Sequence, residues 1–560
     1  MNPFTQDGPK LGNQFSDDLA MQNYLKRVLS EKMYKEIEPG LTHLGARAAN
    51  EILTLGYAAE AYPPKHIPFD PWGKRIDRIE VSQAWRELER ISAEEKLIAT
   101  AYERRHGDLS RVHQFAKIYL YSPSSAIATC PLAMTDGAAR ALELYGSAEL
   151  KARAFSKLTS GNPDTFWSSG QWMTEKTGGS DVSLTATVAK KVDGKFTLYG
   201  DKWFTSATTS QMAITLARIE GAPPGSKGLS MFYLELRDEK GNLNNIRVHR
   251  LKDKLGTRAV PTAELTLEGT AATLIGTEGD GVKKISSLFS ITRVWNSCCA
   301  ASFMRRGMFL ARDYAHKRVA FGKKLIDHPL HQNTLAELEA QSQGAFHITF
   351  RVAELLGKDE LNTATENDRV LLRVLNPIVK LYTAKKAIAH ASEVLESFGG
   401  AGYCEDTGLP RLLRDAQVLS IWEGTTNVLS LDMVRAHAKE RGLDILAKEI
   451  QNQLEKISES SLPALGGIAE SIKSSLDTAV AMLHKIEKSG SDALEQSARE
   501  LAMGFGDLYA ATLLLSQADW ELKSFGKSLA HLCAERLIRA PKQPPVSLLS
   551  DRQLASLIQL

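Results

Sequence analysis

The stretch that decides the fold is SLTATVAKKVDGKFTLYGDKWFTS, residues 183–206. Short runs of alternating apolar and polar residues flank Asp193-Gly194. This pair favours a tight hairpin turn, because both of its positions tolerate positive φ. The runs MAITLARI, LSMFYLEL and AELTLEG continue the strand pattern to about residue 270. The sequence therefore predicts a β section in the middle of the chain.

Helical periodicity predominates on both sides of this β section. From about residue 15 to 165, segments such as AWRELERISAEEKLIATAYERRH and GAARALELYG carry apolar residues three and four positions apart. The proline-rich stretch AYPPKHIPFDPWG, residues 61–73, is expected to be irregular. Beyond the glycine-rich GTEGDGV, the helical period returns from about residue 283 to 440, as in RRGMFLARDYAHKRVAFG and NPIVKLYTAKKAIAHASEVLESFGG.

The last part of the chain reads as a further helical unit. In SIKSSLDTAVAMLHKIEKSG an apolar stripe is marked by Ile472, Leu476, Ala479, Leu483 and Ile486. The predicted fold class is therefore α+β and mainly α. We expect an N-terminal helical domain at 1–170, a β-barrel or sandwich at 171–282, a helical bundle at 283–440 and an extra helical domain at 441–560.

Composition narrows the class of protein. A chain of 560 residues is too long for one core. With 69 basic and 66 acidic residues the net charge is +3, which gives no reason to expect a nucleic-acid or membrane partner. The five cysteines form no CxxC pair and have no zinc-ligand spacing to histidine, so we expect no metal site and a reducing compartment. We find no signal peptide and no run of about 18 apolar residues, which favours a cytoplasmic protein.

The common catalytic motifs do not occur in this sequence. No GxGxxG follows a strand, and there is no GxSxG elbow, Walker loop or HExxH. Three less conspicuous segments remain: MTEKTGGSD (173–181), KWFTS (202–206) and LSIWEGTTNVLSL (419–431). The Gly-Gly-Ser of the first can expose backbone N–H groups to a ligand, but such a tripeptide is more often only a turn. The aromatic residues of the second could line a planar cofactor or end a core strand.

The third segment holds one carboxylate, Glu423, in apolar company. One interpretation is a carboxylate near a helix N-terminus, since Gly-Thr-Thr-Asn is typical of cap chemistry. The other, about equally supported by residue types, is a functional acid. Flanked by Ile421 and Trp422, Glu423 is expected to be desolvated, and desolvation raises the pKa of a carboxyl group towards the range useful for a general base.

Together these segments resemble the acyl-CoA dehydrogenase family. MTEKTGGSD is similar to the family's Thr-Glu-x-x-x-Gly-Ser-Asp, and RVAFG (318–322) to its Arg-x-x-Phe-Gly. FGGAGYCED and LLRDAQVLSIWEGTTN are similar to its Gly-Gly-x-Gly-Tyr and Arg-Asp-x-x-x-x-x-Ile-x-Glu-Gly-Thr segments. The extra helical domain and the segments TCPLAMT, RLKDKLG and SIWEG are most similar to the AidB-like branch of the family. That branch is associated with the bacterial response to DNA alkylation.

The resemblance implies non-covalent FAD and a homotetramer. In family members the flavin lies between the β domain and the second helical domain, and a neighbouring subunit completes the site. By this resemblance, the residues expected to contact the isoalloxazine ring of the flavin are Met173, Thr174, Gly179, Ser180, Phe204, Thr205 and Ser206. The residues expected to hold the flavin and its ribityl-phosphate arm are Ile421, Trp422, Gly424, Thr425 and Asn427. Arg318 and Phe321 resemble positions that reach across a subunit interface to the pyrophosphate and adenine.

The resemblance also gives Glu423 a role. It resembles the catalytic base that removes the α-proton of an acyl thioester while the β-hydride passes to the flavin. A general base of this kind contributes about 10²–10⁴-fold to the rate. In some members the base comes instead from the helix that here contains SITRVWN. In this chain the residue at that position is Thr292, which is not a base, so Glu423 is the only candidate that the resemblance gives. Arg293 resembles a substrate-side arginine.

Two positions depart from the family pattern. His328-Pro329 and Glu396 stand where many relatives have glutamines that help to bind the adenine half of the cofactor. No residue set for the CoA moiety is identified, and the electron acceptor is not indicated.

The leading interpretation is a cytoplasmic FAD-dependent acyl-CoA dehydrogenase of the AidB-like type, with an acyl-CoA or fatty-acyl ligand. One alternative is a DNA-associated protein of the alkylation response. Residues 439–560 hold 14 Lys or Arg and 16 Asp or Glu, a difference of −2, which does not favour DNA binding. The other alternative is a protein that binds and sequesters acyl chains without catalysis.

Overall fold

The computed structural model describes residues 5–238, 240–457, 459–539 and 556. The chain forms two compact units, each assembled from separate stretches of sequence. The first unit takes residues 5–50, 106–123 and 296 onward, and the second takes 51–105 and 124–295. The four predicted domains are continuous stretches, and their boundaries stay a prediction. The end of the last of them, residues 540–555 and 557–560, lies outside the described residues.

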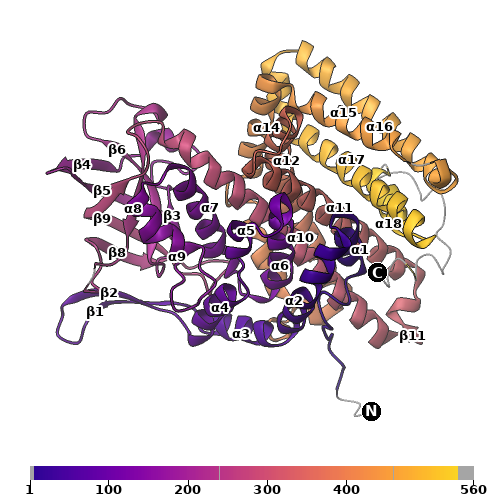
Figure 1. Cartoon of the computed structure of the whole chain (residues 1–560). Helices are drawn as coiled ribbons and strands as arrows, with labels where there is room; N and C mark the ends of the chain where they lie inside the picture. Colours follow the sequence, from indigo (N-terminus) through magenta and orange to yellow (C-terminus); the bar gives the residue numbers. More distant parts are fainter. Residues whose placement is uncertain (1–4, 239, 458, 540–555, 557–560) are drawn as a thin grey trace. The chain divides into compact units, whose positions relative to one another are not determined.

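The second unit contains the predicted β section (Figure 1). Its main strands are β3 (Ser169–Trp172), β4 (Val188–Val192), β5 (Lys195–Ser206), β6 (Met212–Ile219), β7 (Leu229–Glu235), β8 (Ile246–Leu251) and β9 (Thr262–Leu274). Its helices are α3 (Glu51–Ala61), α4 (Gln83–Glu94), α5 (Ala99–Glu103), α7 (Thr129–Tyr145), α8 (Ala148–Leu150) and α9 (Ser156–Leu158). Helix α10 (Gly281–Lys317) starts here and continues into the first unit.

The seven main strands form one sheet that closes on itself. The order is β3-β6-β4-β5-β9-β7, with β8 paired to β9. An additional pairing of β6 with β7 joins the two ends of the β6-β4-β5-β9-β7 path into a barrel. Strand β8 alternates buried and exposed residues, whereas β6 and β7 are buried almost throughout. The inward residues form an apolar core that includes Phe196, Phe232 and Leu265. The predicted β-barrel is therefore confirmed.

The predicted hairpin turn is confirmed at Asp193-Gly194. These residues have φ of 49° and 78°, and they join β4 to β5, where Val192 pairs with Lys195. Two successive positive φ angles match the right-handed twist of the flanking strands, and this is the reason that Asp-Gly is favoured at such turns.

The prediction that residues 61–73 are irregular is wrong in part. Lys65–Phe69 forms β1, which pairs antiparallel with β2 (Arg75–Glu80). The pairing register shifts between Ile67 and Phe69, at Pro68. Proline has no N–H to donate to the ladder, so it is tolerated in a strand at such an irregularity.

The first unit is helical, apart from a small hairpin. Its helices are α1 (Leu19–Val28), α2 (Glu31–Ala49), α6 (Ser110–Tyr121), α11 (Pro329–Glu360), α12 (Glu366–Ser397), α13 (Pro410–Leu419), α14 (Thr426–Glu440), α15 (Gly442–Glu455), α16 (Leu462–Lys488), α17 (Ser491–Phe525) and α18 (Ala530–Ile538). The hairpin strands are β10 (Val319–Ala320) and β11 (Lys323–Lys324).

The C-terminal helices of this unit pack as the apolar stripe predicts. Ile472, Leu476 and Leu483 of α16 are fully buried, and Ala479 and Ile486 are half-buried. Helix α16 contacts α15, α17 and α18, and Figure 1 shows α15, α16 and α17 lying lengthwise beside one another. Among the described residues, no helix combines the length and the apolar character needed to span a membrane.

Candidate functional site

In the second unit, the segment MTEKTGGSD follows β3 directly. Met173 is buried and Thr174 is half-buried. Glu175 and Gly178 exchange two backbone hydrogen bonds of 3.1 and 3.2 Å, which folds the chain into a tight turn. Gly179 then approaches Thr174, and a Cβ added to Gly179 would lie 3.1 Å from the Thr174 methyl carbon. The predicted turn is present, and it leaves Gly179 and Ser180 exposed.

A buried ion pair joins this segment to the second predicted segment, KWFTS. The ammonium group of Lys202 is fully buried and donates to Oε1 of Glu175 at 2.7 Å. Burial lowers the pKa of Lys202, while the Glu175 carboxylate opposes this effect. Glu175 also accepts from the backbone N–H of Ala186 at 2.6 Å and from the Thr187 hydroxyl at 2.5 Å. One carboxylate therefore holds three chain segments together.

The two predicted segments also meet through their backbones. The N–H of Trp203 donates to the carbonyl of Thr174 at 3.0 Å. In KWFTS, Phe204 is the most open predicted residue, with 58% of its surface exposed. Thr205 and Ser206 are buried, and their hydroxyls bond to Ala263 and Thr262 of β9. The hydroxyls of Thr205 and Ser206 therefore fix β5 to β9.

A lysine covers the aromatic pair of this segment. The ammonium of Lys252 lies 3.5 Å from the Trp203 ring centroid and 4.7 Å from that of Phe204. It also donates to Glu264 at 2.6 Å. A hydrogen bond from Arg250 and the nearby Lys252 lower the pKa of Glu264 to about 2. A charged carboxylate thus holds Lys252 over the rings, where cation–π attraction is favourable.

In the first unit, Glu423 lies in the short loop between α13 and α14. The amides of Ile421 and Trp422 both bond back to the carbonyl of Val418, at 2.8 and 3.0 Å. Glu423 and Gly424 then take φ angles of 57° and 106°. The left-handed region is unfavourable for a residue with a Cβ such as Glu423, so its occupation there, followed by a glycine of positive φ, marks a sharply turned, tightly determined loop.

This loop ends at the N-terminus of α14. Thr425 is the N-cap residue, yet its side chain makes no capping hydrogen bond. Thr425 therefore stands at the predicted cap position but does not form the capping hydrogen bond, and both Thr425 and Asn427 are exposed. Glu423 itself stands two residues before the cap, outside the helix. The positive end of the α14 dipole and its first N–H groups are therefore next to Glu423 in the chain.

The burial expected for Glu423 is only partial in this chain. Glu423 and Trp422 are half-buried, and Ile421 is exposed. These three residues lie in the loop between α13 and α14 and not within a packed helix. Apolar neighbours in sequence did not imply burial in space.

The segment RVAFG forms the β10–β11 hairpin instead of continuing helix α10. Phe321 and Gly322, with φ of 48° and 79°, make the turn, and Phe321 is 99% exposed. Arg318 is exposed and donates to the side chain of Gln6 at 3.2 Å. The ring nitrogen of His328 lies 3.0 Å from the carbonyl of Ala320 and so braces the hairpin.

Arg293, the predicted substrate-side residue, is half-buried on the part of α10 that belongs to the second unit. In that unit the structure brings Met173, Thr174, Gly179 and Ser180 next to the segment of Phe204, Thr205 and Ser206. In the first unit it places Ile421, Trp422, Glu423, Gly424, Thr425 and Asn427 in one loop and helix start. Arg318 and Phe321 lie apart from that loop in sequence, on their own hairpin.

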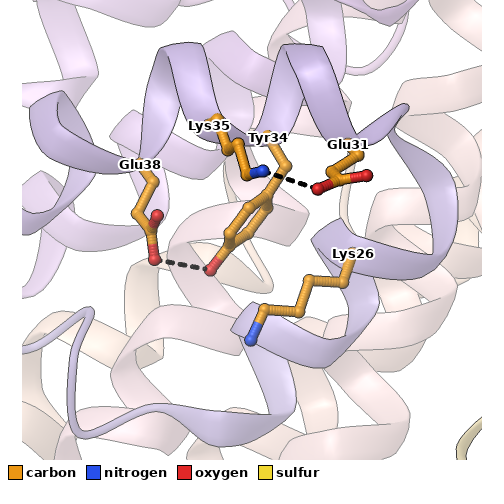
Figure 2. A pocket seen from close by; sticks show the side chains of 5 residues that line it. All are labelled: Lys26, Glu31, Tyr34, Lys35 and Glu38. Carbon is orange, nitrogen blue, oxygen red and sulfur yellow. Dashed lines mark hydrogen bonds and ion pairs between the residues drawn. The ribbon is translucent and has the colours of Figure 1, made fainter. Parts of the chain in front are cut away.

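A surface pocket of about 290 Å³ lies elsewhere, on α1 and α2 (Figure 2). Figure 2 shows its lining: Lys26, Glu31, Tyr34, Lys35 and Glu38. Lys35 pairs with Glu31 at 2.5 Å, and the Tyr34 hydroxyl donates to Glu38 at 3.1 Å. None of the predicted site residues lines this pocket, and four of its five polar side chains pair with one another, so we assign it no role.

Sequence reasoning missed several residues that shape the site. Glu175, Lys202 and Trp203 stand inside the quoted motifs, so their position was an available signal. Lys252 stands in RLKDKLG and Lys380 in the middle of α12. The ammonium of Lys380 donates to the carbonyl of Gly424 at 2.7 Å. No pattern in the sequence signals that contact, which joins positions 44 residues apart.

Four family descriptions match successive parts of the chain. They are the AidB N-terminal domain at residues 9–165, the acyl-CoA dehydrogenase middle domain at 170–270, the acyl-CoA dehydrogenase C-terminal domain at 279–438 and the acyl-CoA dehydrogenase 11 C-terminal domain-like family at 441–539. Acyl-CoA dehydrogenase family member 11 of Caenorhabditis elegans is 43% identical over 529 residues, which cover 92% of this chain and 86% of that protein. The chain belongs to the acyl-CoA dehydrogenase family.

Further relatives agree with this assignment. AidB of Escherichia coli K12 is 32% identical to this acyl-CoA dehydrogenase, over 71% of this chain and 74% of AidB. The crystal structure of C. elegans ACDH-11 in complex with C11-CoA has a TM-score of 0.92 and 41% identity, and covers 98% of this chain and 94% of that one. The apo form of Bd2924 has a TM-score of 0.86 and 54% identity, over 92% and 99%.

The predicted fold class is confirmed: helical N- and C-terminal domains, a middle β domain and an extra C-terminal domain. The cofactor of this family is FAD, and the enzymes are oxidoreductases that act on CH–CH bonds. The residues of this chain fit such a cofactor. Thr425 leaves the N-terminus of the 15-residue helix α14 without a side-chain cap, and such an end suits a phosphate group. The exposed Gly179-Ser180 turn beside Thr174 offers backbone and hydroxyl donors to a polar ring edge.

Proposed function

We propose that this protein dehydrogenates an acyl-CoA thioester, with Glu423 as the base that removes the α-proton. The observation that carries the proposal is the place of Glu423. A single carboxylate stands in a sharply turned loop, directly before a helix N-terminus whose cap hydroxyl is unused. The tight backbone gives the carboxylate a defined direction, which a proton-transferring group requires.

The chain's own residues would act as follows. Glu423 takes the α-proton at its carboxylate, from a loop position two residues before the N-cap of α14. Arg293 is the proposed substrate-side cation. Bound FAD supplies an acceptor for the β-hydride. The protein contributes position and electrostatics, and a positioned base is worth about 10²–10⁴-fold in rate.

We further propose which residues hold FAD. The flavin ring is assigned to Met173, Thr174, Gly179, Ser180, Phe204, Thr205 and Ser206, with Thr205 and Ser206 acting through their main chain. The ribityl-phosphate arm is assigned to Ile421, Trp422, Gly424, Thr425 and Asn427. Arg318 and Phe321 are assigned to the adenine half in a neighbouring subunit of a homotetramer. The 99% exposure of Phe321 within one chain supports a role at such an interface.

The substrate class follows from a relative of high similarity. ACDH-11 has been crystallised with C11-CoA, and this chain matches that structure over 98% of its length. We propose that this protein takes acyl-CoAs of similar, medium chain length. We also propose a cytoplasmic location, since the small number of cysteines and their spacing favour a reducing compartment.

The test is anaerobic. The purified flavoprotein is mixed with saturated acyl-CoAs of graded chain length, and the oxidised-flavin absorbance is followed. We expect rapid bleaching by medium-chain substrates, and a loss of about 10²–10⁴-fold in rate for Glu423→Gln with flavin still bound. The enoyl-CoA product is identified by mass spectrometry.

Two outcomes would contradict the proposal. Bleaching that persists in Glu423→Gln would remove the base assignment. Tight binding of acyl-CoA without bleaching at any chain length would replace dehydrogenation by sequestration of acyl chains.

A further inference from the structure

A fully buried lysine contacts the loop that carries Glu423. Lys380 lies in the middle of α12 and has 0% of its surface exposed. Its ammonium donates to the carbonyl oxygen of Gly424 at 2.7 Å. A buried ammonium is unfavourable unless its protons are hydrogen-bonded, so a lysine at this position implies a requirement for its contacts.

The bonded carbonyl belongs to the peptide between Gly424 and Thr425, the second peptide after Glu423. Residues 421 and 422 are held to α13 by their bonds to Val418, and Leu429 is held to Thr425 within α14. Between these anchors the chain takes φ of 57° at Glu423 and 106° at Gly424. The peptide plane between Gly424 and Thr425 follows these two residues, and because glycine is conformationally permissive this plane can rotate into other arrangements unless something holds it. Lys380 holds the Gly424 carbonyl.

We propose that Lys380 is a positioning residue for Glu423. By fixing the Gly424 carbonyl it sets the orientation of the turn, and so the direction in which the Glu423 carboxylate projects. The inference rests on the proposed role of Glu423 as the base. Lys380 itself does not contact substrate in this scheme, and the proposed effect passes through the Gly424 carbonyl.

The same helix supplies a matched control. Lys386 lies six residues later on α12, and its ammonium pairs with Asp507 of α17 at 3.0 Å. Its side chain is 22% exposed, and its partner is on another helix of the bundle. Lys386→Met therefore removes a lysine and a packing contact from α12 without touching the Gly424 carbonyl, whereas Lys380→Met removes the contact with the loop.

The first measurement is of loop order in the full-length flavoprotein. Backbone amide hydrogen exchange, read by mass spectrometry on peptides that cover residues 420–430, is compared between wild type, Lys380→Met and Lys386→Met. We expect faster exchange in these peptides for Lys380→Met alone. This readout does not depend on turnover.

The second measurement is of the base. Exchange of the α-hydrogen of a medium-chain acyl-CoA in D₂O is followed by NMR, together with kcat and KM for flavin reduction. We expect α-exchange and kcat of Lys380→Met to fall about 10-fold to 100-fold with KM nearly unchanged, because a misdirected base impairs the transition state more than binding. Lys386→Met should match wild type.

The outcomes separate the two proposals. If Glu423→Gln is inactive but Lys380→Met exchanges α-hydrogen like wild type, positioning by Lys380 is wrong and the base assignment stands. If Glu423→Gln retains α-exchange, the base assignment fails whatever Lys380 does. Lys380→Arg, which keeps a charged donor, is made in parallel. If both Lys380 variants fail to fold, Lys380 is required for the fold, and the claim of a specific role in directing Glu423 is overturned.

Discussion

Two buried lysines, one in each unit, hold backbone at predicted site segments, and they do so in different ways. Lys202 in the barrel pairs with a carboxylate, Glu175, which itself accepts from Ala186 and Thr187. Lys380 in the helical unit donates to a neutral carbonyl, that of Gly424. Both ammonium groups are fully buried.

The difference follows from what each lysine must hold. Lys202 and Glu175 join whole strands and turns that are far apart in sequence, and a charged pair with several bonds suits a permanent part of the barrel. Lys380 holds a single peptide of a loop. The ammonium–carbonyl bond fixes the orientation of that peptide. The comparison predicts a graded series of effects when each contact is removed.

The largest loss of stability is expected for Glu175→Gln. The substitution keeps the shape but leaves the Lys202 ammonium buried without its counter-charge, and breaking such a pair costs about 3–5 kcal/mol. Lys202→Met should cost less, because Glu175 keeps its bonds from Ala186 and Thr187. Urea denaturation followed by circular dichroism measures both. Equal losses of unfolding free energy in the two variants would show that the hydrogen bonds from Ala186 and Thr187 to Glu175 do not contribute to the difference.

An intermediate loss is expected for Lys380→Met. The substitution leaves the Gly424 carbonyl without this donor, and an unsatisfied buried polar group costs about 1–3 kcal/mol. The free energy of unfolding of Lys380→Met, compared with that of Glu175→Gln in the same assay, gives the ranking. A larger loss for Lys380→Met would reverse the comparison and make Lys380 the more structural of the two lysines.

A small loss is expected for an exposed pair next to the buried one. Lys176 directly follows Glu175 in the sequence, and Asp201 directly precedes Lys202. The charged groups of Lys176 and Asp201 lie 3.7 Å apart, and both side chains are largely exposed. Exposed ion pairs contribute about 0–1 kcal/mol, so Lys176→Met should be nearly neutral. This variant is the matched control for Lys202→Met. A loss as large as that of Lys202→Met would mean that burial does not account for the difference.

The smallest effect is a dependence on pH at Glu264. The pKa of this carboxyl falls from an ordinary 4.5 to about 2, chiefly through the hydrogen bond from Arg250. A lowered folded-state pKa stabilises the folded protein above pH 4.5, and this stabilisation is lost as the pH falls from 4.5 towards 2. Thermal melts of wild type and Glu264→Gln should therefore differ near neutral pH, by about 1 kcal/mol or less, and converge at low pH. A constant difference at all pH values would contradict this account.

The local parts of the fold could be predicted from the sequence because they depend on neighbouring residues. Asp193-Gly194 predicts its own turn, and Ile472, Leu476 and Leu483 predict the buried face of α16. The β1–β2 hairpin could not be predicted, because its pairing partners and the irregularity at Pro68 outweigh the local proline signal. The half-burial of Glu423 was missed for a similar reason: burial depends on the direction of a loop, and apolar neighbours do not set that direction.

The sequence by itself determined the family, the order of helical and β sections and the place of Glu423 ahead of a helix N-terminus. These features depend on periodicity, turn residues and short motifs, all of which are local. Only the tertiary structure decided that Lys202 meets Glu175, that Lys252 covers Trp203 and that Lys380 reaches the carbonyl of Gly424. A lysine has the same local pattern whether it is solvated or buried, and its partner is chosen by the packing of elements far apart in the chain.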